Sequence, residues 1–308
     1  MTLVVVAANP HFIVQVSDRR ITAAAARVLS EESNKTIVWT TEGARFLVGY
    51  TGVAGTTDKI DTHFLLCELI QDCAPRASFD PFATIELVGA ELGKVLQKRK
   101  PYRGVALEAK RLTVSFTGIL YDDAGVGAPV HAQVSNFQRW GKPDEVRARS
   151  GFDVQHFEEP LGTPWPTLIS AIGAWNVVTS EDYDRIGSLL VSGKPPRAVR
   201  DWMLSMLPEW ALRAHGTVGL QASSVIVTAD LNSPPRTRYH SSVNSPSIFE
   251  VSQVFTTPQI CMAMVDPEIT AGDEGGRPLA VPRVDPRRRC PCGSGKVYRL
   301  CHGPLRKD

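Results

Sequence analysis

The chain has 308 residues, 43% of them hydrophobic, so it is long enough to bury one sizeable core and to carry an appended module. It contains no run of eighteen apolar residues, and its start lacks the basic and apolar segments of a signal peptide, so we expect a cytoplasmic protein with no membrane span. Six cysteines are too few for a disulfide scaffold. We expect Cys67, Cys73 and Cys261, which lie in apolar surroundings, to be small buried side chains.

The charge is divided unevenly between the body and the tail of the chain. Residues 283–308 hold eight Lys or Arg and two Asp or Glu, whereas the whole chain carries a formal charge of only +2. The rest of the chain is therefore acidic. This division indicates a separate basic segment able to meet an acidic protein, RNA or lipid head group.

The first fifty residues predict two strand pairs. Leu3–Ala7 is an apolar run and Phe12–Val16 alternates, with an Asn-Pro turn between them, which is typical of a hairpin. Thr36–Thr40 and Arg45–Tyr50 are joined by Thr-Glu-Gly and predict a second pair.

Two helices are expected to follow these strands. Thr56 or Thr57 can cap the first helix. The apolar side expected for this helix is formed by Ile60, Phe64, Cys67 and Ile70. The second helix is predicted to start at Asp80 and to end in a basic run before Pro101. Its apolar stripe is formed by Ile85, Val88, Leu92 and Leu96.

The second half of the body predicts a strand, two helices and a further strand. These elements are Leu112–Tyr121, helices near 180–192 and 196–213, and Ser223–Ala229. Residues 122–165, rich in Gly, Pro and charge, are assigned to no element. The order of strands and helix pairs is satisfied by two stacked sheets with a helical layer outside each. The predicted fold class is therefore α+β, a four-layer αββα sandwich.

Composition changes divide the chain into four parts. The body covers residues 1–232, and residues 233–265 form an extension in which Ser247–Phe255 and Gln259–Val265 predict edge strands or an extended arm. Residues 266–285 are rich in Pro, Gly and Arg and predict a linker. Residues 286–308 form the basic tail.

The tail carries a predicted zinc site. Cys290, Cys292, Cys301 and His302 supply three thiolates and one imidazole, the ligand set of a closed structural zinc site with no open position for catalysis. Gly293 and the following residues allow a tight turn between the ligand pairs. About twenty residues bury too little surface to fold alone, so zinc binding and local folding are expected to be one event.

Residues 286–304 resemble the SEC-C motif in their Cys-x-Cys, Gly-Ser-Gly-Lys, Tyr298 and Cys-His elements. The resemblance implies a zinc-binding adaptor that contacts a protein partner, including chaperones and ribosomes. The tail is also rich in basic residues. They are Arg287, Arg288, Arg289, Lys296, Arg299, Arg306 and Lys307. Two interpretations of these charges stay open: a contact with acidic protein or ribosomal RNA, and a solvated tail that keeps the module soluble.

The N-terminus carries a candidate catalytic site. If Met1 is removed, Thr2 holds a hydroxyl and a free α-amine, a nucleophile and a base on one residue. Lys35 is a candidate for the cation that lowers the pKa of the amine, and Asp18 for the carboxylate that holds Lys35. Backbone amides of the turn around Gly52 are candidates for an oxyanion hole.

This part of the chain resembles the proteasome β-subunits and their bacterial relatives, members of the N-terminal nucleophile (Ntn) hydrolases. The resemblance is carried by Thr2-Leu-Val-Val-Val-Ala, Val16-Ser-Asp-Arg-Arg, Asn34-Lys-Thr-Ile-Val and Gly49-Tyr-Thr-Gly-Val-Ala. The Thr-to-Asp spacing matches that family, and the Lys is displaced by about one residue. The resemblance implies an αββα sandwich, Thr2 as nucleophile, Asp18 and Lys35 as activators, Gly52 at the oxyanion hole, and a homo-oligomer.

Two positions depart from the pattern of that family. Gly173-Ala174 stands where the family has Gly-Ser, and Gly219 stands where it has an Asp; Ser223 or Ser224 is a candidate substitute. Two hypotheses therefore stay open. One is a threonine hydrolase that cleaves an amide or peptide bond, and the other is an inactive scaffold of the same fold that docks through its tail. The histidines outside the tail show no metal-ligand spacing and are expected to be surface or core residues.

Overall fold

A computed structural model describes residues 2–22, 28–30, 35–53, 62–98, 106–122, 125–139, 147–157, 167–215, 217–231, 233–240, 251–264, 271–272 and 278–279. The strands, in chain order, are β1 (Leu3–Asn9), β2 (Phe12–Asp18), β3 (Ile21–Thr22), β4 (Val28–Ser30), β5 (Thr36–Thr41), β6 (Ala44–Gly52), β7 (Leu112–Tyr121), β8 (Gly127–Ser135), β9 (Asp153–Phe157), β10 (Leu168–Gly173), β11 (Ala222–Thr228), β12 (Arg236–His240), β13 (Ser252–Thr256), β14 (Cys261–Met264), β15 (Ala271–Gly272) and β16 (Pro278–Leu279). The helices are α1 (Thr62–Arg76), α2 (Pro81–Lys98), α3 (Ser180–Val191) and α4 (Pro196–Arg213), with 3-10 turns η2 (Leu107–Lys110) and η3 (Trp175–Val177).

Two large sheets form the centre of the molecule. The first sheet has the strand order β10-β1-β2-β11-β12, and the second has the order β14-β13-β5-β6-β7-β8-β9. Neighbouring strands run antiparallel apart from β13, which pairs with β5 in parallel. Strands in the middle of each sheet alternate between a helix-facing side and a side that faces the other sheet, because side chains on a strand point to opposite faces in turn.

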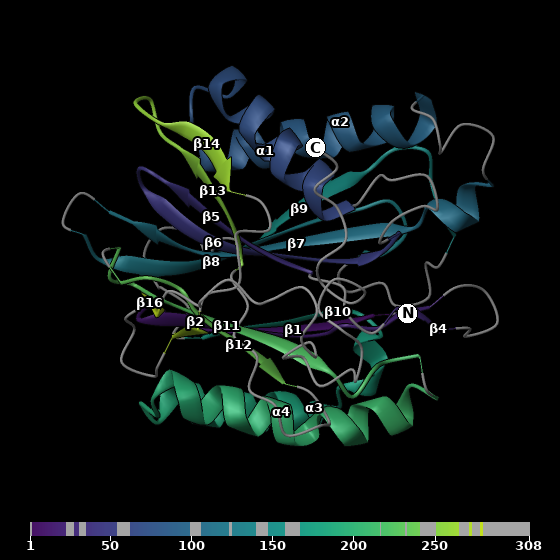
Figure 1. Ribbon diagram of the computed structural model, residues 1–308, viewed down its shortest axis with the longest axis vertical. Helices are drawn as coiled ribbons and strands as arrows, with labels where there is room; N and C mark the ends of the chain where they lie inside the picture. The colour runs from purple at the N-terminus through teal and green to yellow at the C-terminus, as the bar shows by residue number, and fades with distance from the viewer. Residues whose placement is uncertain are drawn as a thin grey trace, which may run out of the picture.

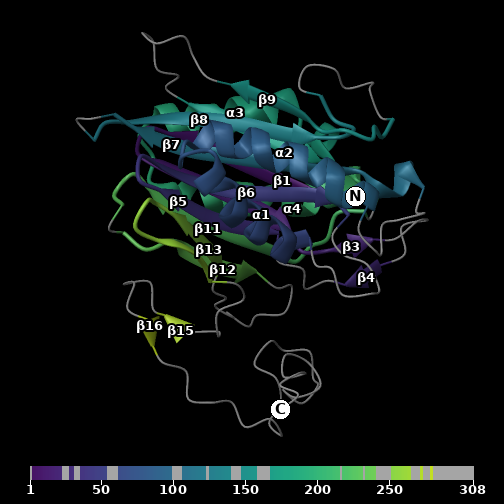
Figure 2. The same ribbon diagram turned by 90° about the horizontal axis from the view of Figure 1, so that it is seen from above.

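Three buried clusters fill the spaces between four layers. Helices α1 and α2 pack on the second sheet, α3 and α4 pack on the first sheet, and a third cluster lies between the two sheets. Figure 1 shows these layers edge-on, and Figure 2 shows α1 and α2 lying over the second sheet. The predicted αββα sandwich is confirmed.

The predicted elements differ from the observed ones at two places. Phe64 of helix α1 is 41% exposed, so its assignment to the apolar side of this helix was wrong. The buried side of α1 contains Cys67 and Ile70, as predicted, together with Leu65, Leu66, Leu69 and Cys73. The stretch 122–165, which had no assignment, contains β8 and β9, and β10 follows it. The predicted caps Thr56 and Thr57 lie outside the described residues, as does Ile60.

The C-terminal strands complete both large sheets. Strand β12 forms one edge of the first sheet, β13 lies beside β5, and β14 forms an edge of the second sheet. The predicted edge position is therefore correct for β14, whereas β13 has a neighbour on each side. The short strands β15 and β16 pair within the segment predicted as a linker. The four predicted zinc ligands lie outside the described residues.

Two further predictions, on the cysteines and on membrane-spanning helices, can be compared with the structure. Cys67 and Cys73 are buried as expected, but Cys261 is exposed on β14, so its assignment as a buried side chain was wrong. Cys261 lies on an edge strand, where few neighbours cover a side chain. Among the described residues, no helix is both long and apolar enough to cross a membrane.

A glycine of β7 makes room for the aromatic part of the core. Gly118 lies opposite Phe46 of β6, and a Cβ added at Gly118 would lie 2.4 Å from the Phe46 ring. That ring stacks on Trp39 with centroids 4.8 Å apart. Phe46 is fully buried and has little freedom to move aside.

We therefore predict that Gly118→Ala lowers the free energy of unfolding by about 1–3 kcal/mol, because the added methyl overpacks the core. Urea denaturation followed by tryptophan fluorescence measures the loss. Gly43→Ala is the matched control, since a Cβ there meets nothing within 4 Å. An equal change in the two variants would contradict the packing argument.

Candidate active site

Thr2, Asp18 and Lys35 come together at one end of the space between the sheets. Thr2 immediately precedes β1, and Asp18 is the last residue of β2, the neighbouring strand. Lys35 comes from the other sheet, directly before β5. All three are buried, with exposed fractions of 6%, 1% and 1% in the same order.

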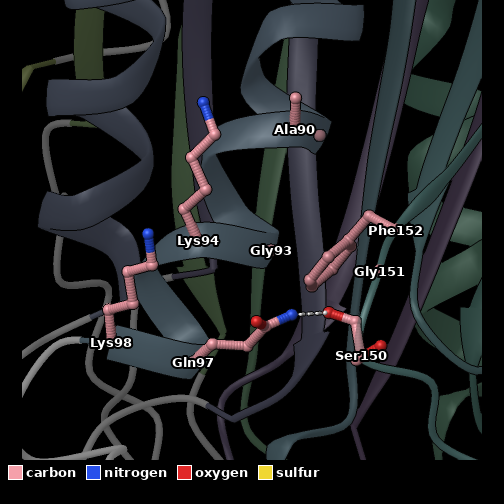
Figure 3. A pocket seen from close by; sticks show the side chains of 9 residues that line it. Ala90, Gly93, Lys94, Gln97, Lys98, Ser150, Gly151 and Phe152 are labelled. Carbon is pink, nitrogen blue, oxygen red and sulfur yellow. Dashed lines mark hydrogen bonds between the residues drawn. The ribbon is translucent and has the colours of Figure 1, made fainter.

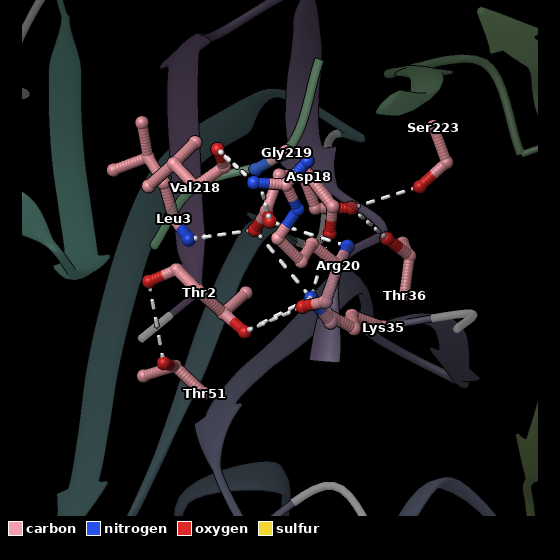
Figure 4. A network of polar contacts seen from close by, with 11 residues as sticks. Thr2, Leu3, Asp18, Arg20, Lys35, Thr36, Thr51, Val218, Gly219 and Ser223 are labelled. Atoms are coloured by element: carbon pink, nitrogen blue, oxygen red, sulfur yellow. Dashed lines mark hydrogen bonds and ion pairs between the residues drawn. The ribbon is translucent and has the colours of Figure 1, made fainter. Parts of the chain in front are cut away.

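The Lys35 ammonium lies between the other two residues (Figure 4). Its Nζ is 2.9 Å from Thr2 Oγ1 and 3.4 Å from Asp18 Oδ1. It also donates to two backbone carbonyls, that of Asp18 at 2.9 Å and that of Arg20 at 2.7 Å. Four oxygen atoms around one nitrogen stabilise the charged ammonium, because each accepts a hydrogen bond or attracts the positive charge.

The Asp18 carboxylate is held from three sides by the backbone. It accepts hydrogen bonds from the amides of Leu3 at 2.8 Å, Gly219 at 3.0 Å and Arg20 at 3.2 Å. Burial raises the pKa of Asp18 above its usual range, while the Lys35 ammonium and the three amides favour the carboxylate. These contacts fix the direction of the carboxylate, which lies beside Lys35.

The turn at Gly52 leaves fewer free amides than the sequence suggested. The amide of Val53 donates to the Arg111 carbonyl at 2.9 Å, so it is not free for a ligand. Hydrogen-bonded and non-bonded pairs alternate along an antiparallel ladder, so the amide of Gly52, which lies opposite Leu112, points away from β7. Gly52 has a φ of +108°, and a Cβ there would lie 2.0 Å from the Arg111 carbonyl oxygen, so only glycine fits.

The backbone of Thr2 is fixed by the end of β10. Its carbonyl accepts a hydrogen bond from the amide of Ala174 at 2.9 Å and one from the Thr51 hydroxyl at 3.4 Å. Gly173, with a φ of +84°, allows this approach, because a Cβ at this position would lie 1.8 Å from the Thr2 carbonyl oxygen.

The structure adds residues that the sequence did not single out as contacts. The amide of Gly219 reaches Asp18, and the carbonyl of Arg20 reaches Lys35. Sequence patterns report side chains and not backbone groups, so these two contacts left no signal beyond a glycine before β11 and a turn after β2.

The two serines suggested as substitutes lie farther out. Ser223 bonds to the Ser17 hydroxyl at 2.8 Å, and Ser17 lies 3.4 Å from Thr36 Oγ1. Ser224 bonds to His240 Nε2 at 2.8 Å. Ser223 therefore connects to the residue after Lys35, whereas Ser224 belongs to a separate contact.

Two of the histidines outside the tail are core residues, as expected from the sequence for some of them. His63 and His131 are both 1% exposed, and desolvation lowers their pKa to about 4 and about 3. His131 is hydrogen-bonded to Thr117 at 2.8 Å and to Ser170 at 3.3 Å. In the part of the chain that the structure describes, no three His, Cys, Asp or Glu side chains gather as metal ligands would.

The fold and the cluster together define the molecule as an αββα sandwich with a buried Thr-Asp-Lys cluster at the start of its first strand. Beyond this body, the family model of the SEC-C motif matches residues 289–304. A 27-residue stretch is 67% identical to the protein translocase subunit SecA of Polaromonas sp. (strain JS666 / ATCC BAA-500). That stretch covers 9% of this chain, and the chain spans only 3% of the length of that relative.

Several solved structures are similar to most of the chain. An Anbu (Gly-1) mutant from Hyphomicrobium sp. strain MC1 has 15% identity and a TM-score of 0.45, covering 79% of this chain and 88% of that one. The helical assembly of the Anbu complex from Pseudomonas aeruginosa has 12% identity, the same coverage and a TM-score of 0.43. Eukaryotic HslV from Trypanosoma brucei has 11% identity and a TM-score of 0.39, covering 73% and 99%. Because these identities and TM-scores are low, the fold assignment rests on the four layers described above.

We predict that Asp18→Asn lowers the free energy of unfolding by about 3–5 kcal/mol, because it leaves the Lys35 ammonium buried without its carboxylate. Urea denaturation at neutral pH measures the loss. Asp153→Asn is the control: its ion pairs with Arg139 and Arg149 are partly exposed, so a change of about 1 kcal/mol or less is expected. Equal losses in both variants would argue against a buried ion pair at Asp18.

We also predict that stability falls as the pH drops from about 6.5 toward 3, with His131 contributing about 1.4 kcal/mol per pH unit. The unfolded chain binds a proton at His131 near the ordinary value of 6.5, whereas the folded chain binds it only near 3. The stability is therefore fully present above pH 6.5 and is lost on acidification. Unfolding free energies measured in urea across this range should show a shallower slope for His131→Gln; an unchanged slope would refute the assignment.

Proposed function

We propose that the chain is an N-terminal threonine hydrolase that cleaves an amide or peptide bond after removal of Met1. One observation carries the proposal: Lys35 Nζ lies 2.9 Å from Thr2 Oγ1 and pairs with Asp18 in a buried setting. A solvated Asp or Lys at a strand end, the ordinary alternative, would not converge with a partner from the other sheet on one hydroxyl.

The chemistry would follow from these positions. The free amine of Thr2 accepts the proton of Oγ1 as the oxygen attacks the carbonyl carbon of the substrate. The Lys35 ammonium, hydrogen-bonded to Oγ1, stabilises the negative charge that builds on this oxygen and disfavours protonation of the amine. Lys35 acts as a fixed charge rather than as a base, since its Nζ already donates to several oxygens.

The remaining steps need a donor for the oxyanion and a water molecule. The amide of Gly52, turned away from β7, is the candidate donor to the tetrahedral oxyanion. When the carbon–nitrogen bond breaks, the amine of Thr2 returns its proton to the leaving nitrogen, and an ester forms on Oγ1. Water, deprotonated by the same amine, then hydrolyses the ester and restores Thr2.

The tail is proposed to be a zinc-binding docking module. The support is the match of the SEC-C motif to residues 289–304, which include Cys290, Cys292, Cys301 and His302. Three thiolates and one imidazole fit a closed tetrahedral zinc ion that supplies folding energy and no open position. The partner we propose is a protein or a ribosomal surface of acidic character, because the tail is basic.

A second candidate function is a non-catalytic scaffold of the same fold. It is favoured by Ala174 and Gly219, which reach Thr2 and Asp18 through backbone amides and bring no side-chain hydroxyl or carboxylate to the site. In that case the ion pair of Asp18 and Lys35 serves the fold alone. Deletion of the tail would then abolish partner capture, whereas Thr2→Ala would change nothing.

The decisive experiment for the hydrolase uses a peptide β-lactone, which acylates hydroxyl nucleophiles, with intact-mass and peptide mass spectrometry as the measurement. Thr2 of the wild-type chain should gain the mass of the lactone, Thr2→Ala should gain none, and Lys35→Met should react at least tenfold more slowly, because the cation beside Oγ1 is lost.

Lys94→Met, which removes an exposed lysine, is the matched control and should react like the wild type. Retention of Met1 in the purified protein, or labelling that survives Thr2→Ala, sinks the proposal. The same intact-mass spectrum reports both results.

For the tail, we predict one zinc ion per chain, measured by metal analysis of the purified protein. Cys292→Ser should lose most of this zinc, because a closed site needs all four ligands. Cys261→Ser, which removes an exposed cysteine of the body, should keep it. Equal zinc contents in the two variants would place the metal elsewhere.

A further inference from the structure

The site depends on the outer edge of β10. This strand is an edge of the first sheet and pairs only with β1 among the described strands. The amide of Ala174 donates to the Thr2 carbonyl, so Gly173 and Leu3 form a non-bonded pair of this ladder. By the alternation of an antiparallel ladder, the amide and carbonyl of Gly173 therefore point outward, away from β1. An edge strand normally leaves such groups to water or to another strand.

A side chain from the segment that follows β8 occupies this edge. The Gln138 carboxamide accepts from the amide of Gly173 at 3.3 Å and donates to the carbonyl of Gly173 at 3.2 Å. The carboxamide therefore offers one donor and one acceptor, as the backbone amide and carbonyl of a paired strand would. Gln138 thus takes the place of a neighbouring strand at Gly173, where β10 approaches the Thr2 carbonyl.

The backbone of Gln138 is itself fixed. The Ser135 hydroxyl, at the end of β8, accepts from the amide of Gln138 at 2.8 Å, and Gln133 Nε2 donates to the carbonyl of Gln138 at 3.4 Å. Ser135 and Gln133 are buried, at 1% and 4% exposure. The carboxamide is therefore presented from a segment that is fixed to the end of β8, and these contacts set its position on Gly173.

Gly173 links the position of the Gln138 carboxamide to that of Thr2. Its φ of +84° belongs to the left-handed region, which a glycine leaves easily when nothing holds it. The next residue, Ala174, supplies the amide that holds the Thr2 carbonyl at 2.9 Å. A rotation at Gly173 would move this amide, and with it the direction in which Thr2 presents Oγ1 to Lys35.

We propose that Gln138 is a positioning residue of the Thr2 site: its carboxamide pairs with the peptide groups of Gly173 and so fixes the turn that orients the nucleophile. This proposal rests on the proposed threonine hydrolase for its kinetic consequence, but the pairing itself does not. Gln138 acts through Gly173 and Ala174 and takes no part in bond making.

The test compares Gln138→Met, which removes both hydrogen bonds, with the wild-type chain. The probe is the peptide β-lactone: Thr2 Oγ1 attacks the lactone carbonyl, the ring C–O bond breaks, and the ring oxygen takes the proton. We expect the maximal labelling rate to fall by roughly 10- to 100-fold, because a nucleophile displaced by about 1 Å reacts up to about 100-fold more slowly, with little change in the concentration for half-maximal rate.

Gln97→Met is the matched control. Gln97 on α2 also bonds a backbone carbonyl through its carboxamide, that of Ser150 at 2.8 Å, but in an open groove of α2 outside the site (Figure 3). This variant should label at the wild-type rate.

Gln138→Glu supplies a readout that a purely structural role would not move. A carboxylate keeps the acceptor for the amide of Gly173 but cannot donate to its carbonyl, whereas a protonated carboxyl can do both. The labelling rate of this variant, divided by that of the wild type at the same pH, should therefore rise as the pH falls toward 5. A ratio that is constant with pH contradicts the pairing.

Amide hydrogen exchange of the peptide 168–175 gives an answer that needs no activity. Gln138→Met should speed exchange in this peptide, and Gln97→Met should not. If the wild type is never labelled on Thr2, the proposed hydrolase function is wrong. Faster exchange in Gln138→Met would still support the pairing of the Gln138 carboxamide with Gly173. Unchanged exchange, or labelling at the wild-type maximal rate in Gln138→Met, overturns the proposal for Gln138.

Discussion

The ammonium of Lys35 is the contact on which the geometry of the site depends. It enters from the second sheet and meets oxygen atoms of Thr2 and Asp18, at the ends of β1 and β2, and of Arg20, which follows β2. A charge with 1% exposure is tolerated only where a counter-charge and hydrogen bonds replace water. The two sheets cannot slide past one another without breaking this set, so the need to satisfy one buried cation fixes the register between the two sheets at this end of the molecule.

Other polar contacts cross the same space. Gln15 Nε2 of β2 donates to Thr36 Oγ1 of β5 at 2.7 Å, and Ser170 of β10 lies 3.3 Å from His131 of β8. The remainder of the layer between the sheets is an apolar cluster that includes Val4, Val6, Ile13, Leu47 and Val225. Apolar contacts hold the sheets together without fixing direction, whereas hydrogen bonds are directional. The apolar cluster therefore holds the two sheets together, and the hydrogen bonds fix the alignment of the sheets near Thr2.

The sequence predicted the four layers and the cluster of Thr2, Asp18 and Lys35, but not the backbone hydrogen bonds that hold this cluster in place. Alternating and helical hydrophobic patterns placed most strands and helices. The amine and hydroxyl of Thr2, together with the family resemblance that includes Asp18 and Lys35, suggested a site. Phe64 was misplaced because it lies at the margin of the buried side of α1, where His63 is buried in its place, and β8 and β9 were missed because Gly, Pro and charged residues interrupt their surroundings. The amides of Gly219 and Ala174 could not be predicted, since every residue but proline carries an amide and only the fold aims it.

The parallel strand β13 ties the C-terminal part of the chain to the body. Val254 of this strand is fully buried, and Thr256 accepts a hydrogen bond from the Trp39 indole at 2.8 Å. A chain shortened before β13 would uncover the aromatic centre of the second sheet and leave β5 as an open edge. The junction at which evolution or an engineer can exchange the tail without disturbing the body therefore lies beyond Met264, the end of β14.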